Sequence, residues 1–192
     1  LVYGIGHILA RLVTFLLLPL YTNVFTASEY GVVALFYTFL SFMNVIMRYG
    51  LGAAFLKFYV PASDSERKVI FTNVIASLFL TGIPFFLVWH GLRNLISPII
   101  LGINEPSFIS IMGIIIVLDT IWSIPLLGFR AENRPILFII FSLLNVGITI
   151  GLNLFLILKM HMGIRAIFLS NLSASLCIFL LSLPFIYRRF EF

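Results

Sequence analysis

Uncharged apolar stretches of about 20 residues recur along this 192-residue chain, and they constrain its fold more than any other feature. A helix of about 20 residues spans the roughly 30 Å hydrocarbon core of a bilayer. None of the stretches alternates polar and apolar residues, which excludes a transmembrane β-barrel. The sequence predicts six membrane-spanning helices, at residues 3–25, 31–52, 69–89, 107–128, 135–158 and 166–187.

The composition also favours a membrane protein. Hydrophobic residues make up 61% of the chain and charged residues only 10%, and its 21 Phe would leave large exposed apolar patches on a soluble domain. The net charge of +5 does not indicate a nucleic-acid partner, because the Lys and Arg residues are spread over short loops. We therefore predict an all-α polytopic membrane protein in which residues 1–192 form a single six-helix transmembrane lobe.

Motifs for catalysis or cofactor binding are absent from the sequence. Cys177 is the single cysteine, and the three His residues share no metal-ligand spacing. The sequence contains no nucleophile–base set, Walker motif or dinucleotide loop. We expect no cofactor, no metal and no enzymatic activity.

The distribution of Lys and Arg predicts the orientation. With a cytoplasmic amino terminus, the inner segments carry seven of these residues and the outer segments three, so both ends are expected in the cytoplasm. The longest outer loop, residues 90–106, has apolar residues on one helical face and predicts a short interfacial helix despite Pro98. A chain that starts at Leu1 and has no soluble tail is expected to be a fragment of a longer product.

Three charged residues interrupt the apolar stretches: Arg11, Arg48 and Asp119. Charge at membrane depth is costly and usually faces a bundle interior or a watery cavity. At 1.5 Å per residue, these side chains lie about 12, 6 and 14 Å from the inner ends of their spans. Because arginine stays charged when buried and its planar fork of donors suits phosphate oxygens, Arg11 and Arg48 are candidate ligands for an anionic substrate.

Each of the three residues also has a simpler interpretation. Arg48 is shallow enough to reach the lipid headgroups by snorkelling, whereas Arg11 lies deeper. Asp119 could form a salt bridge with one of the arginines, or bind a coupling proton or cation. The sequence leaves these alternatives open.

Amides and small residues within the spans indicate how the helices pack. Interhelical hydrogen bonds from intramembrane amides are worth about 1 kcal/mol. We expect such bonds from the five amides within the spans: Asn44, Asn73, Asn145, Asn153 and Asn171. Gly147 and Gly151 form a GxxxG pattern, which predicts close helix packing.

Three stretches resemble one known family. RLVTFLLLPLYTNVFTASEYGVVAL, at residues 11–35, resembles the start of bacterial polysaccharide flippases of the Wzx type, where an apolar helix precedes a Glu-Tyr-Gly turn. GFRAENRPILF, at residues 128–138, is similar to an inner loop of that family. Residues 143–171 are similar to its Asn-rich fifth helix, Gly-containing turn and sixth helix. These stretches follow the family's order over most of the chain.

The resemblance implies the multidrug/oligosaccharidyl-lipid/polysaccharide exporter fold, in which two six-helix lobes surround a cavity and work by alternating access. The chain corresponds to the amino-terminal lobe, so a second six-helix lobe is an expected partner, either a missing carboxy-terminal half or another copy. Related lipid II flippases carry cavity arginines on the first two helices, where Arg11 and Arg48 lie in this chain. The family has twelve or more helices, and this chain has six.

The resulting hypothesis is a flippase of the bacterial inner membrane. It would move undecaprenyl-diphosphate-linked oligosaccharide units to the outer leaflet for O-antigen, capsule or exopolysaccharide synthesis, with the lipid-linked oligosaccharide and membrane lipids as partners. One alternative is a cation-coupled exporter of small drugs, for which only Asp119 is acidic at depth. Another is a non-transporting membrane subunit of cell-envelope synthesis. The sugar unit and the coupling ion are not determined by the sequence.

Overall fold

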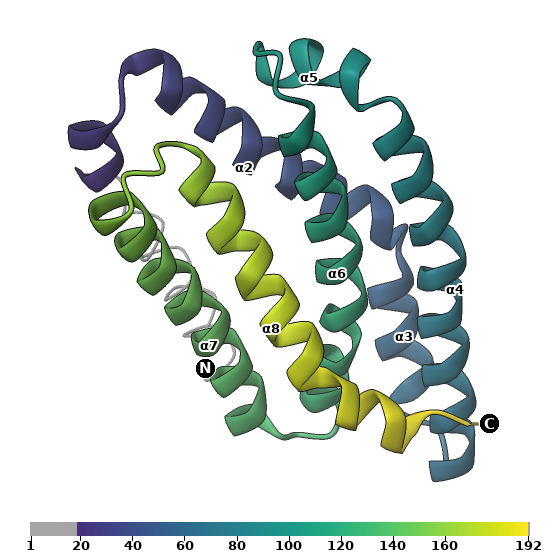
Figure 1. Cartoon of the computed structure of the whole chain (residues 1–192). Coiled ribbons are helices and arrows are strands. Elements are labelled where there is room, and N and C mark those ends of the chain that lie inside the picture. The colour runs from purple at the N-terminus through teal and green to yellow at the C-terminus, as the bar shows by residue number, and fades with distance from the viewer. Residues whose placement is uncertain (1–18, 192) are drawn as a thin grey trace.

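The computed structural model describes residues 19–191, and every regular element within that range is a helix (Figure 1). Five apolar helical stretches are long enough to cross a membrane, which confirms an all-α polytopic fold. They match the second to sixth predicted spans, whereas most of the first, residues 3–25, lies outside the described residues. The five are α2 (Ala27–Arg48), α4 (Asp64–Gly91), α6 (Pro106–Ala131), α7 (Pro135–Leu154) continued by the π-helix η1 (Phe155–Lys159), and α8 (Arg165–Arg189).

The second predicted span is interrupted in the structure. α2 ends at Arg48, and Tyr49 and Gly50 then adopt left-handed φ values of 30° and 83°. Glycine accepts this conformation without a steric penalty, which allows the chain to turn here. α3 (Leu51–Tyr59) adds nine residues, or about 14 Å of helix, beyond the turn. Arg48 thus lies at the junction of two helices, farther from the end of the helical stretch than the sequence predicted.

The loops on either side of α4 are ordered by local signals. α4 begins five residues earlier than predicted because Ser63 and Glu66 form a capping box, in which the Ser63 backbone N–H donates to Glu66 Oε2 at 2.8 Å. After α4, the predicted short helix is confirmed as α5 (Arg93–Leu101), which ends at Gly102 with φ of 67°. Figure 1 shows α5 at one end of the bundle, connecting α4 to α6.

α6 is the central helix. Within the described chain, 61% of the most apolar 18-residue stretch of α6 is buried, against 6% for the corresponding stretch of α7 with η1. α6 also contacts every other α-helix from α2 to α8. The close approach of α4 depends on Gly113, where a Cβ atom would lie 2.7 Å from the Trp89 ring. Trp89 Nε1 donates to the Ile109 carbonyl at 2.7 Å, which fixes the indole against α6.

Aromatic clusters join α6 to its neighbours near both ends. Phe168 of α8 lies between Phe36 of α2 and Phe108 of α6, with ring centroids 4.2 and 4.1 Å away. Near the other end of α6, rings from α6, α7 and α8 meet with centroids 5.0 to 5.7 Å apart. Such pairs contribute about 0.5–1.5 kcal/mol beyond the area they bury. The rings of this second cluster are Phe129, Phe141 and Phe185.

The predicted packing residues have mixed outcomes. Asn171 Nδ2 donates to the Tyr37 hydroxyl at 3.1 Å, which joins α8 to α2 as expected. Asn153 is fully buried, but neither atom of its amide group has a hydrogen-bond partner among the described residues, so its predicted bond is not formed there. No described residue lies within 4 Å of a Cβ atom built at Gly147 or Gly151, so no described helix makes the predicted close contact there.

The helices alternate in direction, so the segments richest in Lys and Arg meet at one end of the bundle, seen at the bottom of Figure 1. The α3–α4 turn, the α6–α7 turn and the last turn of α8 line one pocket there. We call this end the basic end, after its seven cationic residues: Lys57, Arg67, Lys68, Arg130, Arg134, Arg188 and Arg189.

Candidate functional site

Arg48 lies beside a cavity of about 240 Å³ between α2, α6 and α7, which we call the arginine cavity. The residue is half-buried at the end of α2, and within residues 19–191 its buried Nε atom has no hydrogen-bond partner. An unsatisfied buried donor costs about 1–3 kcal/mol, so a ligand that accepted a hydrogen bond from this guanidinium would remove that cost. The cavity lining comprises Arg48, Trp122, Ser123, Leu126, Leu127, Arg130, Phe138, Ser142, Asn145 and Val146.

The lining charges of the arginine cavity are all positive. Arg48 and Arg130 both line it, and no Asp or Glu is among its described lining residues. Two guanidinium groups beside Ser142 and Asn145 favour a small anionic group with several oxygens. The volume lies below the roughly 300–1,000 Å³ of most ligand pockets, so the cavity can hold a headgroup fragment and not an oligosaccharide.

Asp119 is half-buried on α6 and lies close to the arginine cavity. Its Oδ1 atom accepts hydrogen bonds from Trp122 Nε1 at 2.9 Å and from Ser175 Oγ of α8 at 2.5 Å. Trp122 also lines the cavity, and the charges of Asp119 and Arg48 interact electrostatically. Among the described residues, however, no ion pair within 4.0 Å includes Asp119. Its direct contacts connect α6 to α8.

The second arginine that the structure shows at this cavity is Arg130, whereas the sequence suggested Arg11. Arg11 lies outside the described residues, so its proximity to Arg48 stays a prediction. Arg130, which sequence reasoning assigned to an inner loop, belongs to the last turn of α6 and lines the same cavity as Arg48. The spacing of Ser123, Leu127 and Arg130 places them on one helical face, and this signal could have identified Arg130 had the fourth span been extended to residue 131.

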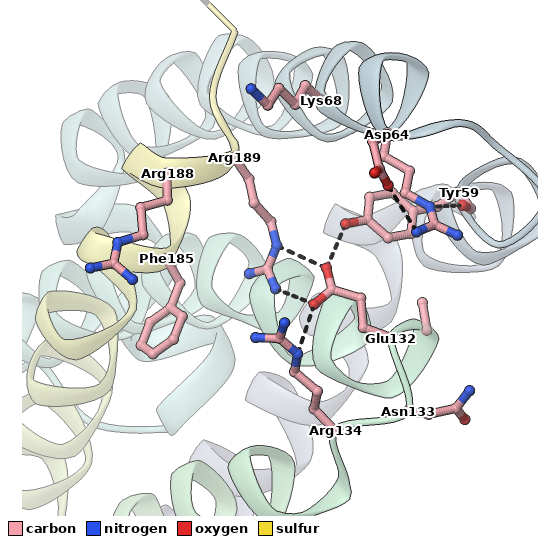
Figure 2. A pocket seen from close by; sticks show the side chains of 11 residues that line it. Tyr59, Asp64, Lys68, Glu132, Asn133, Arg134, Phe185, Arg188 and Arg189 are labelled. Atoms are coloured by element: carbon pink, nitrogen blue, oxygen red, sulfur yellow. Dashed lines mark hydrogen bonds and ion pairs between the residues drawn. The ribbon is translucent and has the colours of Figure 1, made fainter.

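A second polar cluster occupies the basic end and is centred on Glu132, at the carboxyl end of α6 (Figure 2). Arg189 of α8 donates to its two carboxylate oxygens from Nε at 3.0 Å and from Nη2 at 2.7 Å. The Tyr59 hydroxyl of α3 donates to Oε1 at 2.7 Å, and Arg134 Nε lies 3.4 Å from Oε2. Glu132 therefore joins three segments that are distant in sequence. In the sequence, Glu132 stands out only as part of the stretch GFRAENRPILF at residues 128–138, and no role was predicted for it.

The pKa shifts in this cluster follow from burial and hydrogen bonding. Burial, followed by the hydrogen bond to Glu132, raises the pKa of Tyr59 to about 12, so its phenol remains a donor at neutral pH. Burial is also the largest single influence on Glu132 and favours its neutral form. The hydrogen bonds from Arg189 and Tyr59, with the charges of Arg189 and Arg134, outweigh burial and lower the pKa of Glu132. Glu132 is therefore an ionised acceptor at neutral pH.

The apolar helices and their buried polar residues define a polytopic α-helical membrane protein. A family model described as "Polysaccharide biosynthesis protein" matches residues 1–192. The chain belongs to this polysaccharide biosynthesis protein family, which confirms the family resemblance seen in the sequence. No curated protein and no solved structure matches the chain.

Proposed function

We propose that this chain is the amino-terminal lobe of a flippase that carries undecaprenyl-diphosphate-linked oligosaccharide units across the bacterial inner membrane by alternating access. The observation that carries the proposal is the arginine cavity, which Arg48 and Arg130 both line and whose described lining residues include no carboxylate. Family membership supports a role in polysaccharide biosynthesis. Translocation makes and breaks no covalent bond, so the proposed activity is transport and not catalysis.

A diphosphate group needs cationic partners on its way across hydrocarbon, because an unpaired charge at membrane depth is costly. Arg48 and Arg130 each bring a positive charge to the cavity, and the Arg48 Nε atom has no hydrogen-bond partner in the part of the chain that the structure describes. Arg11 remains a proposed further ligand. The lipid tail would stay in the bilayer. The sugar units exceed the volume of the cavity, so they require space between this lobe and a second six-helix lobe.

A cation-coupled drug exporter would need a carboxylate that a cationic substrate or coupling ion can reach. Asp119 is the acidic residue at that depth, and its Oδ1 atom already accepts hydrogen bonds from Trp122 and Ser175. No contact of Asp119 in the described chain favours that alternative, and we retain the flippase proposal.

The test is complementation of a flippase-deficient strain by the full-length protein, with surface polysaccharide measured and protein abundance checked by immunoblot. Arg48→Ala should lower transport by roughly 10- to 100-fold, the range that corresponds to one hydrogen bond to a charged group of about 1.5–3 kcal/mol. Arg48→Lys should restore only part of the activity, because an ammonium lacks the bidentate fork.

The matched control is Arg165→Ala, which removes an exposed arginine at the opposite end of the bundle and should leave transport unchanged. Full activity of an Arg48→Ala, Arg130→Ala double variant at normal abundance would refute the assignment of the arginine cavity. The same result with Arg11→Ala added would leave the proposed substrate without a physical basis.

A further inference from the structure

The basic end contains a pocket of about 790 Å³ that the proposed transport function does not use. It lies between the α3–α4 turn, the α6–α7 turn and the last turn of α8 (Figure 2). Its volume falls within the roughly 300–1,000 Å³ that is usual for ligand pockets. We call it the basic pocket.

The basic pocket carries an excess of positive charge. Five basic and two acidic residues line it, and the acidic residues are already engaged. Glu132 pairs with Arg189 and Arg134, and Asp64 pairs with Arg67. The remaining positive charge has no counterpart among the described residues that line the pocket.

Two exposed cations and one unsatisfied guanidinium nitrogen remain at the pocket. Arg189 is 15% exposed, and its other two nitrogens donate to Glu132, whereas its buried Nη1 atom has no hydrogen-bond partner among the described residues. Lys68 and Arg188 are exposed and form no hydrogen bond or ion pair with any residue from 19 to 191. In Figure 2 the Arg189 side chain reaches toward Glu132, whereas the side chains of Arg188 and Lys68 point away from it.

From these observations we propose that the basic pocket binds the phosphate group of an anionic ligand. A phosphate presents several charged oxygens around one centre, which suits guanidinium and ammonium donors that come from α4 and α8. Arg189 would contribute its positive charge from the inner part of the pocket, and Lys68 and Arg188 would contribute charge at its rim.

The surroundings of the basic pocket favour a lipid as the source of that phosphate. Phe185 lines the pocket, and the apolar side chains of Val69 and Leu181 are exposed on the adjoining turns of α4 and α8. The pocket also lies at the ends of membrane-spanning helices, at the level where phospholipid headgroups are expected. A phospholipid could place its phosphate in the pocket and its acyl chains along the apolar helix surfaces.

The test is a titration of the purified protein with phosphatidylglycerol or phosphatidylcholine, with bound lipid counted by native mass spectrometry. We expect phosphatidylglycerol to bind and phosphatidylcholine to bind far more weakly. A Lys68→Gln, Arg188→Gln double variant should bind phosphatidylglycerol about 30-fold more weakly, the effect expected from two cations near a membrane surface. A Lys68→Arg, Arg188→Lys variant keeps both charges and should retain most of the binding.

The control is a Lys159→Gln, Arg165→Gln variant, which removes two charges at the opposite end of the bundle and should bind like the unmodified protein. Unchanged phosphatidylglycerol binding by the Lys68→Gln, Arg188→Gln variant would overturn the proposal. An equal loss of binding in the control variant would also overturn it, because the lipid would then be attracted by the overall charge of the protein and not by this pocket. The Lys68→Gln, Arg188→Gln variant should unfold at the unmodified protein's temperature without lipid, since neither residue has a hydrogen-bond or ion-pair partner among residues 19–191 to lose.

A second arm uses inorganic phosphate in phosphatidylcholine nanodiscs and follows thermal unfolding. Stabilisation of the unmodified protein, but not of the Lys68, Arg188 variant, would support the same site with soluble phosphate as the source. Phosphate binding in the basic pocket does not depend on which substrate the protein transports. If Arg48 variants lose transport but still bind phosphatidylglycerol, the result tests the proposed function alone. If the Lys68→Gln, Arg188→Gln variant loses phosphatidylglycerol binding but keeps transport, the result tests only the basic pocket.

Discussion

Replacement of Glu132 tests whether the polar cluster at the basic end holds the bundle together. The carboxylate accepts three hydrogen bonds from Arg189 and Tyr59, and its side chain is only 16% exposed. Removing one member of a largely buried ion pair costs about 3–5 kcal/mol, because the remaining charge is left unpaired. Glu132→Ala should therefore destabilise the protein by about 3 kcal/mol, whereas Glu132→Gln, which keeps one carbonyl acceptor, should cost about 1–2 kcal/mol.

The assay is thermal unfolding of the purified protein in detergent. For a chain of this size, 1 kcal/mol corresponds to a shift of about 2–4 °C, so Glu132→Ala should lower the midpoint by about 6–12 °C. The matched control is Glu105→Gln, because Glu105 pairs with Arg165 at 3.4 Å in a pair whose side chains are 40% and 61% exposed. An exposed pair of this kind contributes about 0–1 kcal/mol, so the control should shift the midpoint by no more than about 4 °C.

The pH dependence has a defined sign. Because folding lowers the pKa of Glu132, its stabilisation is fully present above the ordinary glutamate pKa of about 4.3 and is lost as the pH falls through the folded value. The difference between the unmodified protein and Glu132→Gln should be constant near neutrality and shrink in acid. Equal shifts for Glu132→Ala and Glu105→Gln, or a difference that grows in acid, would refute the reasoning.

Three further predictions concern the bundle and its orientation. Gly113→Ala should cost about 1–3 kcal/mol in detergent unfolding, since its Cβ atom would lie 2.7 Å from the Trp89 ring; an unchanged midpoint would show that the indole can move aside. Asp119→Asn should lower stability by about 1–2 kcal/mol, Ser175→Ala should do the same, and transport should persist; lost transport at normal stability would instead indicate ion coupling. In a Cys177→Ala background, Ser65→Cys should react with impermeant thiol reagents only from the cytoplasm and Asn104→Cys only from outside, and the reverse pattern would invert the proposed orientation.

Hydropathy by itself determined the fold class and the approximate positions of five described helices. Each membrane-spanning helix satisfies its backbone hydrogen bonds internally, so its presence depends on its own residues and not on its neighbours. The same local character explains why α5 was predicted from its apolar face. It also explains why the α6–α7 turn and the last turn of α8, each rich in arginine, were expected at the same end as the α3–α4 turn.

Tertiary structure decided which polar residues meet. Glu132 binds Tyr59 and Arg189, which are 73 and 57 residues away, and Arg48 lines a cavity with Arg130. These neighbours depend on how α2, α6, α7 and α8 pack and on the turn at Gly50, which lengthens the helical stretch beyond Arg48. Side-chain partners across helices are set by the rotation and crossing of each helix pair. Hydropathy does not encode that geometry, because lipid tails and packed side chains are equally apolar and the helices gain little hydrophobic energy from one arrangement over another.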